Sequence, residues 1–275
     1  MINKILKKID QVPLLPQNIQ QLMAIVNNPQ ASTTELVTIV EQDPALAMQS
    51  LHLCNSAYYS LPVQVTSVTH AVRFLGMDTV AGLAMAAYFQ SLLPSRSNRP
   101  EGHWLKGLKD HLLMTAQLSE TLAKAAGSRV APATLFTAGL LHDMGKLVFS
   151  KLDPKVGQDV YHHATANNLP LIVAEQEMMG TDHAAVGWQM AIRWRLPDVL
   201  MDAIRYHHDP FSSEYTHTLY VFMANKIANT VSDNRPFDPL LNTPEIIPVC
   251  QEMGLSTEQI MALLNAWAAR QEKES

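Results

Sequence analysis

The chain has 275 residues, of which 47% are hydrophobic and only 16% are charged, so it holds enough apolar material for a globular core. Its formal net charge of −5 provides no broad positive field, which argues against nucleic acid as a partner. No apolar stretch approaches the roughly 20 residues that cross a bilayer. Asp10 and Pro13 stand where a secretory signal needs an uninterrupted apolar run. We therefore expect a soluble protein with no membrane partner.

The two cysteines, Cys54 and Cys250, are far apart in the sequence and form no Cys-x-x-Cys pair. This usage indicates neither a disulfide framework nor a thiolate zinc site, and it fits a reducing compartment. We expect the protein to be cytoplasmic.

The first part of the chain carries repeated helix signals. Ser32 and Glu35 have the spacing of a capping box, which marks the start of a helix. A second start follows at Asp43-Pro44, because proline is favoured at the first position of a helix. Residues 61–66 alternate and contain β-branched side chains, which predicts an extended connection or, as the alternative, a short strand.

A polar tract rich in Pro, Ser and Arg occupies residues 94–102 and predicts a linker between two domains. The N-terminal domain then covers residues 1–93, and the C-terminal domain covers residues 103–275. Long helical patterns follow the linker near residues 104–126, 132–150, 157–168, 171–179, 183–195, 198–208, 216–231 and 257–271. We therefore predict an all-α fold of two packed helical bundles.

Ligand-type side chains recur on the predicted C-terminal helices: His111, His142, Asp143, His183, His207 and His208. Such residues on facing helices are how a helical bundle builds a metal centre. Adjacent helical residues project about 100° apart, so His142 and Asp143 serve one centre only if it lies in the angle between them. His207 and His208 close a predicted helix, where the helix dipole favours a cation. We expect these helices to converge on one metal pocket.

Imidazole together with carboxylate suits a divalent transition metal such as Fe, Mn, Zn or Ni. A single histidine in a helix is more often a surface residue or a satisfied core residue, and this alternative applies to each histidine taken alone. The other histidines are interpreted as structural or solvated: His52, His70, His103, His162, His163 and His217.

Residues 140–146, Leu-Leu-His-Asp-Met-Gly-Lys, resemble the signature of the HD superfamily of metal-dependent phosphohydrolases. The order of the ligand-type residues is similar to the extended ligand series of its HD-GYP branch. A closer resemblance, over about residues 12–230, is to the HDOD family. The segments that resemble HDOD motifs are residues 14–16, 39–46, 53–59, 68–76, 182–187, 194–197 and 207–210.

The resemblance implies an all-helical bacterial signalling module with an HD-domain-like C-terminal bundle and one or two metal ions. In the HD pattern a final Asp on a late helix completes the metal site, and Asn225 stands at that position as a neutral ligand. The Gly-Tyr-Pro element of the HD-GYP branch is absent, because His208 is followed by Asp209-Pro210.

Two functions follow from the resemblance. The first is a regulatory module with an HD-like metal site and weak or no catalysis, which works with a signalling protein partner. The alternative is a metal-dependent phosphohydrolase that acts on a phosphorylated small molecule such as a nucleotide or a cyclic dinucleotide. In such an enzyme Asp143 would orient water or bridge ions, and Lys146 would neutralise a phosphate.

Overall fold

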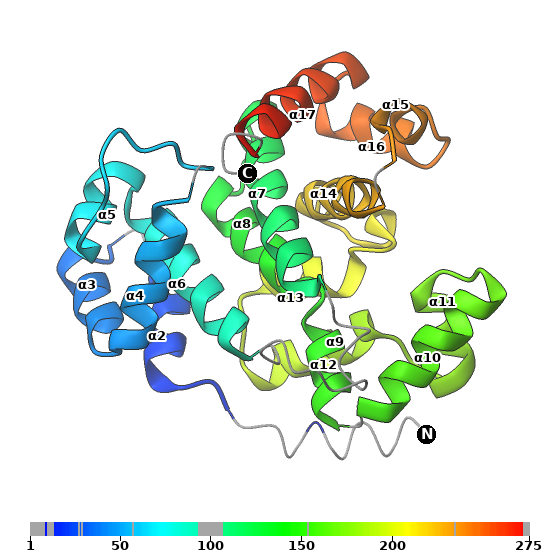
Figure 1. The fold of residues 1–275 in the computed structure, drawn as a ribbon, viewed down its shortest axis with the longest axis horizontal. Helices are drawn as coiled ribbons and strands as arrows, with labels where there is room; N and C mark the ends of the chain where they lie inside the picture. The colour runs from blue at the N-terminus through cyan, green and yellow to red at the C-terminus, as the bar shows by residue number, and fades with distance from the viewer. Residues whose placement is uncertain are drawn as a thin grey trace.

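A computed structural model of the chain describes residues 9, 14–26, 28, 30–56, 58–92, 107–152, 154–233 and 235–271. Every regular element within these ranges is a helix, so the all-α prediction is confirmed (Figure 1). None of the described helices combines the length and the apolar character that a membrane crossing requires.

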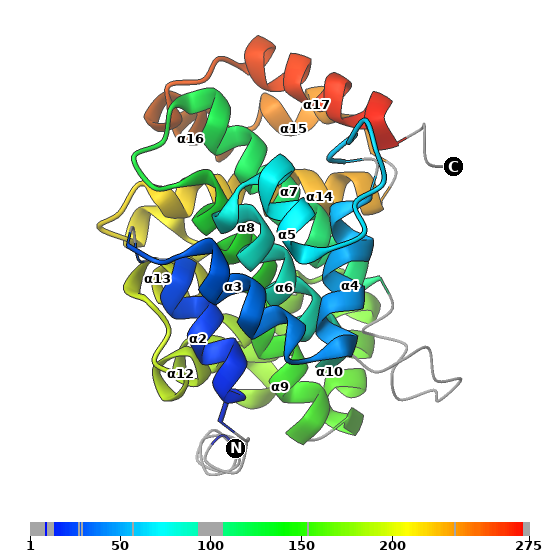
Figure 2. The same ribbon diagram turned by 90° about the vertical axis from the view of Figure 1, so that its left-hand side faces the viewer.

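The N-terminal helices pack around one central helix. In chain order they are α2 (Gln17–Val26), α3 (Thr33–Glu41), α4 (Pro44–Cys54), α5 (Val68–Leu75) and α6 (Met77–Leu92). Helix α6 contacts all of the others, and it is apolar on nearly every side because it is covered all round. Figure 2 views the molecule from the side that α2, α3 and α4 cover.

The C-terminal helices form the larger part of the molecule (Figure 1). They are α7 (Leu108–Ala126), α8 (Pro132–Leu141), α9 (Met144–Leu152), α10 (Pro154–Asn167), α11 (Leu171–Met179), α12 (His183–Arg193), α13 (Asp198–Tyr206), α14 (His217–Ser232), α15 (Phe237–Leu241), α16 (Ile246–Met253) and α17 (Thr257–Gln271). Helix α6 packs on α8, and one apolar core runs through both groups of helices. The predicted linker, residues 94–102, lies outside the described residues, so the domain boundary stays a prediction.

The helix starts that the sequence predicts in the first part of the chain are found. Ser32 Oγ accepts a hydrogen bond from Glu35 N at 3.1 Å, and α3 begins at the next residue after Ser32. Asp43 Oδ1 accepts from Ala45 N at 3.0 Å and so caps α4. Each cap satisfies a backbone N–H that the first turn of a helix leaves without a partner.

The extended connection at residues 61–66 forms no strand. The side chain of Asn55 pairs with its backbone instead: Nδ2 donates to Val65 O at 2.8 Å, and Val65 N donates to Oδ1 at 2.7 Å. An amide side chain offers the same donor and acceptor as a peptide group, so the segment is satisfied without a partner strand.

The prediction of a single helix over residues 132–150 is wrong, because α8 ends before His142 and α9 begins after Asp143. His142 Nδ1 donates to Gly139 O at 2.6 Å, so the side chain satisfies a carbonyl in the last turn of α8. Lys146 N then donates to Asp143 O at 2.9 Å and starts the next helix. The two ligand-type residues therefore lie at a junction between two helices.

Helices α15 and α16 were not predicted. Their segment contains four prolines, at positions 236, 239, 244 and 248, which read as breakers. In the structure Pro239 and Pro248 lie in the first turns of the two helices, where no backbone N–H is needed for a helical hydrogen bond.

Helices α9 and α12 approach each other closely through two glycines. A Cβ on Gly145 would lie 2.7 Å from the carbonyl carbon of His183 and 2.9 Å from Gly187 N. These neighbours are backbone atoms, so they could move only if the helix that begins at His183 shifted. Gly145 therefore permits the packing that brings His183 close to Asp143.

Gly145→Ala is expected to destabilise the protein by about 1–3 kcal/mol, the usual effect of overpacking a core. The control is Gly82→Ala on α6, where a Cβ would meet side-chain atoms of Phe136 and Thr137 at 3.4 Å. Alanine is intrinsically better than glycine inside a helix by about 1 kcal/mol, so the control should be neutral or stabilising. Urea unfolding measures both changes. Equal stability of Gly145→Ala and the wild type would contradict the close contact of α9 with α12.

Candidate metal centre

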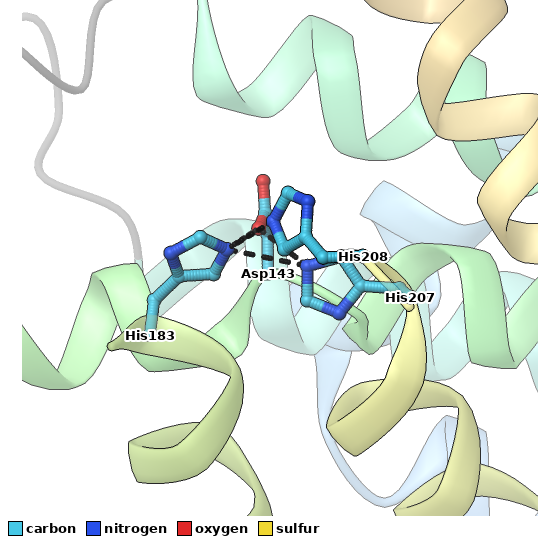
Figure 3. A group of neighbouring side chains, drawn as sticks. All are labelled: Asp143, His183, His207 and His208. Atoms are coloured by element: carbon cyan, nitrogen blue, oxygen red, sulfur yellow. Dashed lines mark hydrogen bonds and ion pairs between the residues drawn. The ribbon is translucent and has the colours of Figure 1, made fainter. Parts of the chain in front are cut away.

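Six of the predicted ligand residues lie together at the centre of the C-terminal helices. They form two donor groups that share one carboxylate: Asp143 with His183, His207 and His208, and Asp143 with His111 and His142. Within each group the ligand atoms lie within 4.8 Å of one another. Figure 3 shows the first group, whose side chains point toward one another from the start of α12, the end of α13 and the junction of α8 with α9.

Asp143 faces the two groups with different oxygens. Its Oδ1 lies 3.1 Å from His183 Nε2 and 3.5 Å from His207 Nε2. Its Oδ2 lies 3.5 Å from His111 Nε2 and 3.4 Å from His142 Nε2. The carboxylate therefore stands between two sets of imidazole nitrogens, as it would if it bridged two ions.

Two of the imidazoles are oriented by their own helices. His142 Nδ1 donates to Gly139 O at 2.6 Å, and His207 Nδ1 donates to Ile204 O at 2.9 Å. In each case the acceptor is a carbonyl in the last turn of the preceding helix. Because a carbonyl only accepts, the ring proton is on Nδ1 and the lone pair of Nε2 faces the centre. This arrangement is typical of histidines that ligate metals.

The imidazole of His183 is oriented by a residue that the sequence analysis missed. Glu175 Oε2 accepts from His183 Nδ1 at 2.6 Å and from His183 N at 2.8 Å. Glu175 is only 2% exposed. A glutamate is almost never fully buried unless it is paired, and the partner of Glu175 is His183. The available signal was an acidic residue inside the apolar run of residues 171–179, whose partner in space the sequence does not reveal.

The centre brings ring nitrogens and a carboxylate oxygen close together. His183 Nε2 lies 2.9 Å from His208 Nε2 and 3.2 Å from His207 Nε2, and His111 Nε2 lies 3.3 Å from His142 Nε2. Asp143 Oδ1 is buried and accepts no hydrogen bond. A buried carboxylate oxygen facing imidazole nitrogens needs a positive charge to be stable. The donor set therefore fits a divalent transition metal.

The protonation states agree with this interpretation. Burial lowers the pKa of His111 to about 3 and the pKa of His207 to about 4, so both rings are neutral at pH 7. Burial by itself would also lower the pKa of His183, but the carboxylates of Glu175 and Asp143 outweigh it and raise that pKa to about 9. In the metal-free protein a proton on His183 thus supplies positive charge beside Asp143.

Asp143 is ionised although it is only 1% exposed. Burial raises its pKa, and the charge of Lys146 with the rings of His142 and His183 outweighs that effect and holds the pKa well below its usual range. Lys146 Nζ lies 2.5 Å from Asp143 Oδ2, on the side of His111 and His142. The two sides of the carboxylate are therefore unequal, because a lysine ammonium already balances Oδ2.

Asn225 lies on α14 and is buried. Its side-chain Oδ1 accepts a hydrogen bond from Asn229 Nδ2 at 3.0 Å, one turn further along the same helix. That oxygen is thus engaged within α14, and the role of Asn225 as a ligand stays a prediction.

Other histidines lie outside the two donor groups. His217 pairs with Asp202 at 3.3 Å, and His163 pairs with Glu177 at 2.9 Å. Both have acidic partners of their own, in line with the structural interpretation of these residues. His103 lies outside the described residues.

Comparison with solved structures shows the same overall fold in several bacterial proteins. A protein of Shewanella amazonensis, provisionally named a phosphohydrolase, is 27% identical with a TM-score of 0.75, covering 97% of this chain and 93% of its own. A provisionally named signal transduction protein of Marinobacter aquaeolei VT8 is 26% identical with a TM-score of 0.74, covering 96% of this chain and 59% of its own. An HDOD domain protein with unknown function from Geobacter sulfurreducens is 23% identical with a TM-score of 0.77, covering 99% and 96%.

Sequence comparison extends the likeness to an uncharacterized protein of Treponema pallidum (strain Nichols). It is 26% identical over 236 residues, which cover 85% of this chain. The match spans only 45% of the length of that relative. The model of the HDOD domain matches residues 12–210 of this chain, which is well over half of it. The motifs, the helical fold and this match agree: the chain belongs to the HDOD domain family.

Proposed function

We propose that the chain is a metal-binding regulatory module of bacterial signal transduction that works with a signalling protein partner. The observation that carries this proposal is the buried set of imidazoles whose Nε2 atoms converge on Asp143 while their Nδ1 protons are held elsewhere. The HDOD match and the provisional name of the Marinobacter relative support the signalling role.

The side of Asp143 Oδ1 is the better metal position. His183, His207 and His208 contribute three nitrogens there, and Oδ1 contributes the fourth ligand atom. On the side of Oδ2, the Lys146 ammonium occupies the carboxylate and would repel a second cation. We therefore expect the first ion on the Oδ1 side and weaker binding on the other.

Burial favours a regulatory role over rapid turnover. Asp143, His142, His183 and His207 are no more than 1% exposed, so a phosphorylated substrate would have to reach the donors past His208, His111 and Lys146. Among the described residues the two donor groups share a single carboxylate, and the resemblance to the HD pattern puts the amide of Asn225 where a second one is expected. A metal with few anionic ligands is bound less tightly and is more easily exchanged.

One observation favours phosphohydrolysis as the second candidate. Asp143 faces two donor groups, and two-metal sites of this kind hold both the attacking and the leaving oxygen in phosphoryl transfer. A bound metal would supply Lewis acidity and a water of lowered pKa. Lys146, which is 18% exposed, would neutralise a phosphate of a nucleotide or cyclic dinucleotide. The provisional name of the Shewanella relative points the same way.

Protein purified without chelator and loaded with Mn²⁺ or Fe²⁺ is expected to retain about one ion per chain, measured by elemental analysis. Asp143→Ala and His207→Ala should lose it, because each removes a ligand atom from the Oδ1 side. His162→Ala, on the exposed face of α10, is the matched control and should retain the ion. Substoichiometric metal in the wild type, or equal metal in all variants, would contradict the metal centre.

The same loaded protein separates the two functions when phosphate release is followed with phosphomonoesters, nucleotides and cyclic di-GMP. A regulatory module should release phosphate far more slowly than the usual enzyme turnover of about 1–10³ per second. Turnover in that range that disappears in Asp143→Ala would show that the phosphohydrolase alternative is correct.

Asn225→Asp is expected to tighten metal binding, because it returns an anionic group to the position where the HD pattern has one. The matched control is Asn265→Asp, which adds the same charge at an exposed position on α17. Isothermal titration with Mn²⁺ should show a lower Kd, or a second bound ion, in Asn225→Asp only. Identical titrations of the two variants would mean that α14 does not face the centre as the resemblance implies.

A further inference from the structure

We propose that Glu175 is the positioning residue for the Oδ1 side of the centre, and that it makes metal retention there depend on the seating of the α10–α11 hairpin. This inference rests on the proposed metal site. Glu175 itself contributes no ligand atom. The inference is that it connects the α10–α11 hairpin at the edge of the molecule to the metal centre.

The contacts of Glu175 fix both the position and the tautomer of His183. One oxygen, Oε2, accepts from the backbone N at 2.8 Å and from Nδ1 at 2.6 Å. The backbone contact holds the first residue of α12, and the Nδ1 contact sets the rotation of the ring. With its proton on Nδ1, the neutral ring would offer its Nε2 lone pair to a metal ion bound beside Asp143 Oδ1, which lies 3.1 Å from Nε2. Carboxylates in this role orient a metal ligand and raise its basicity.

His183 differs from the other oriented imidazoles in where its partner comes from. His142 and His207 are held by carbonyls of their own helices, three residues back, so their orientation is a local property. His183 is held by a side chain eight residues earlier, on a different helix. Its orientation therefore depends on a tertiary contact, which can be lost without unfolding α12.

The helix that carries Glu175 is attached mainly through its hairpin partner. Helix α11 packs chiefly on α10, and α10 packs on α9, whereas α12 packs on α9 and α13 (Figure 1). The hairpin lies at one edge of the molecule, away from the N-terminal helices. A displacement of the hairpin would withdraw Glu175 while leaving His142, His207 and their helices in place.

The corner between α11 and α12 is braced, which makes the contact specific. Gly180 ends α11 in a left-handed conformation with a φ of 70°. Gln176 donates to Asp182, and Asp182 Oδ1 also caps α12 by accepting from Ala185 N at 2.7 Å. Glu175 thus reaches His183 across a short, hydrogen-bonded turn, and among the described residues its buried carboxylate accepts hydrogen bonds from His183 alone.

Coupling between two sites is reciprocal in free energy. If a seated hairpin favours metal binding through Glu175, bound metal must favour the seated hairpin by the same factor. Metal should therefore slow amide hydrogen exchange in residues 171–179 of the wild type. In a variant without the Glu175 carboxylate, metal binding and hydrogen exchange in residues 171–179 should become independent of each other.

The test uses the full chain with Co²⁺ as the probe and three variants: Glu175→Gln, Glu175→Ala and Glu177→Gln. Glu177 lies on the same helix, is 52% exposed in its side chain and pairs with His163, so it is the matched control. Titration should give a Kd about 10–100-fold weaker for Glu175→Ala, the usual effect of removing such a partner. Glu175→Gln keeps an acceptor but loses the charge, so its Kd should fall between those of Glu175→Ala and the control. Metal-dependent slowing of exchange in α11 should persist in the control and vanish in Glu175→Ala.

The outcomes separate this inference from the proposed function. A wild type that binds no Co²⁺ removes the metal site, and the inference with it. Binding by the wild type, with Glu175→Gln and Glu175→Ala within twofold of the control, overturns the inference and leaves the metal site intact. If Glu175→Ala does not fold, the comparison of Glu175→Gln with Glu177→Gln decides in the same way.

Discussion

The candidate metal centre depends on three hydrogen bonds that the Nδ1 atoms of three imidazoles donate. His142 and His207 give theirs to carbonyls at the ends of α8 and α13, and His183 gives its proton to Glu175. Each of these hydrogen bonds satisfies a buried acceptor and at the same time directs an Nε2 atom toward Asp143. The same hydrogen bonds therefore complete the helix ends and orient the candidate ligands. The end of α8 at Leu141 is one of these helix ends.

Close backbone packing sets the distances within the centre. Gly145 follows Asp143 by two residues, and its missing Cβ lets α9 lie directly against the first turn of α12. That contact places His183 Nε2 at 3.1 Å from Asp143 Oδ1. Lys146, the residue after Gly145, forms an ion pair with Asp143 Oδ2. The motif of residues 142–146 thus supplies two candidate ligands, the close approach of two helices and a lysine cation within five residues. A carboxylate with one balanced and one unbalanced oxygen favours a single ion, on the side of the unbalanced Oδ1.

Sequence patterns were sufficient for features that depend on local chemistry. The caps at Ser32 and Asp43, the all-helical class and the grouping of six ligand-type residues follow from spacing and from helix-end preferences. Tertiary features were not accessible in this way. The break in the helix over residues 132–150 depends on the hydrogen bond that the His142 side chain makes. The role of Glu175 depends on a contact between two helices. The short helices α15 and α16 depend on prolines in their first turns. Asn225 was placed by resemblance alone, and its hydrogen bond to Asn229 does not decide its role.

The most direct measurement of the central claim is anomalous diffraction at the absorption edge of Co²⁺ or Mn²⁺ from crystals of the loaded protein. The account predicts one strong peak bonded to Asp143 Oδ1 and to the Nε2 atoms of His183, His207 and His208. A weaker peak, or none, is predicted on the side of His111 and His142. A peak elsewhere, or none at the first position in fully loaded protein, would contradict it.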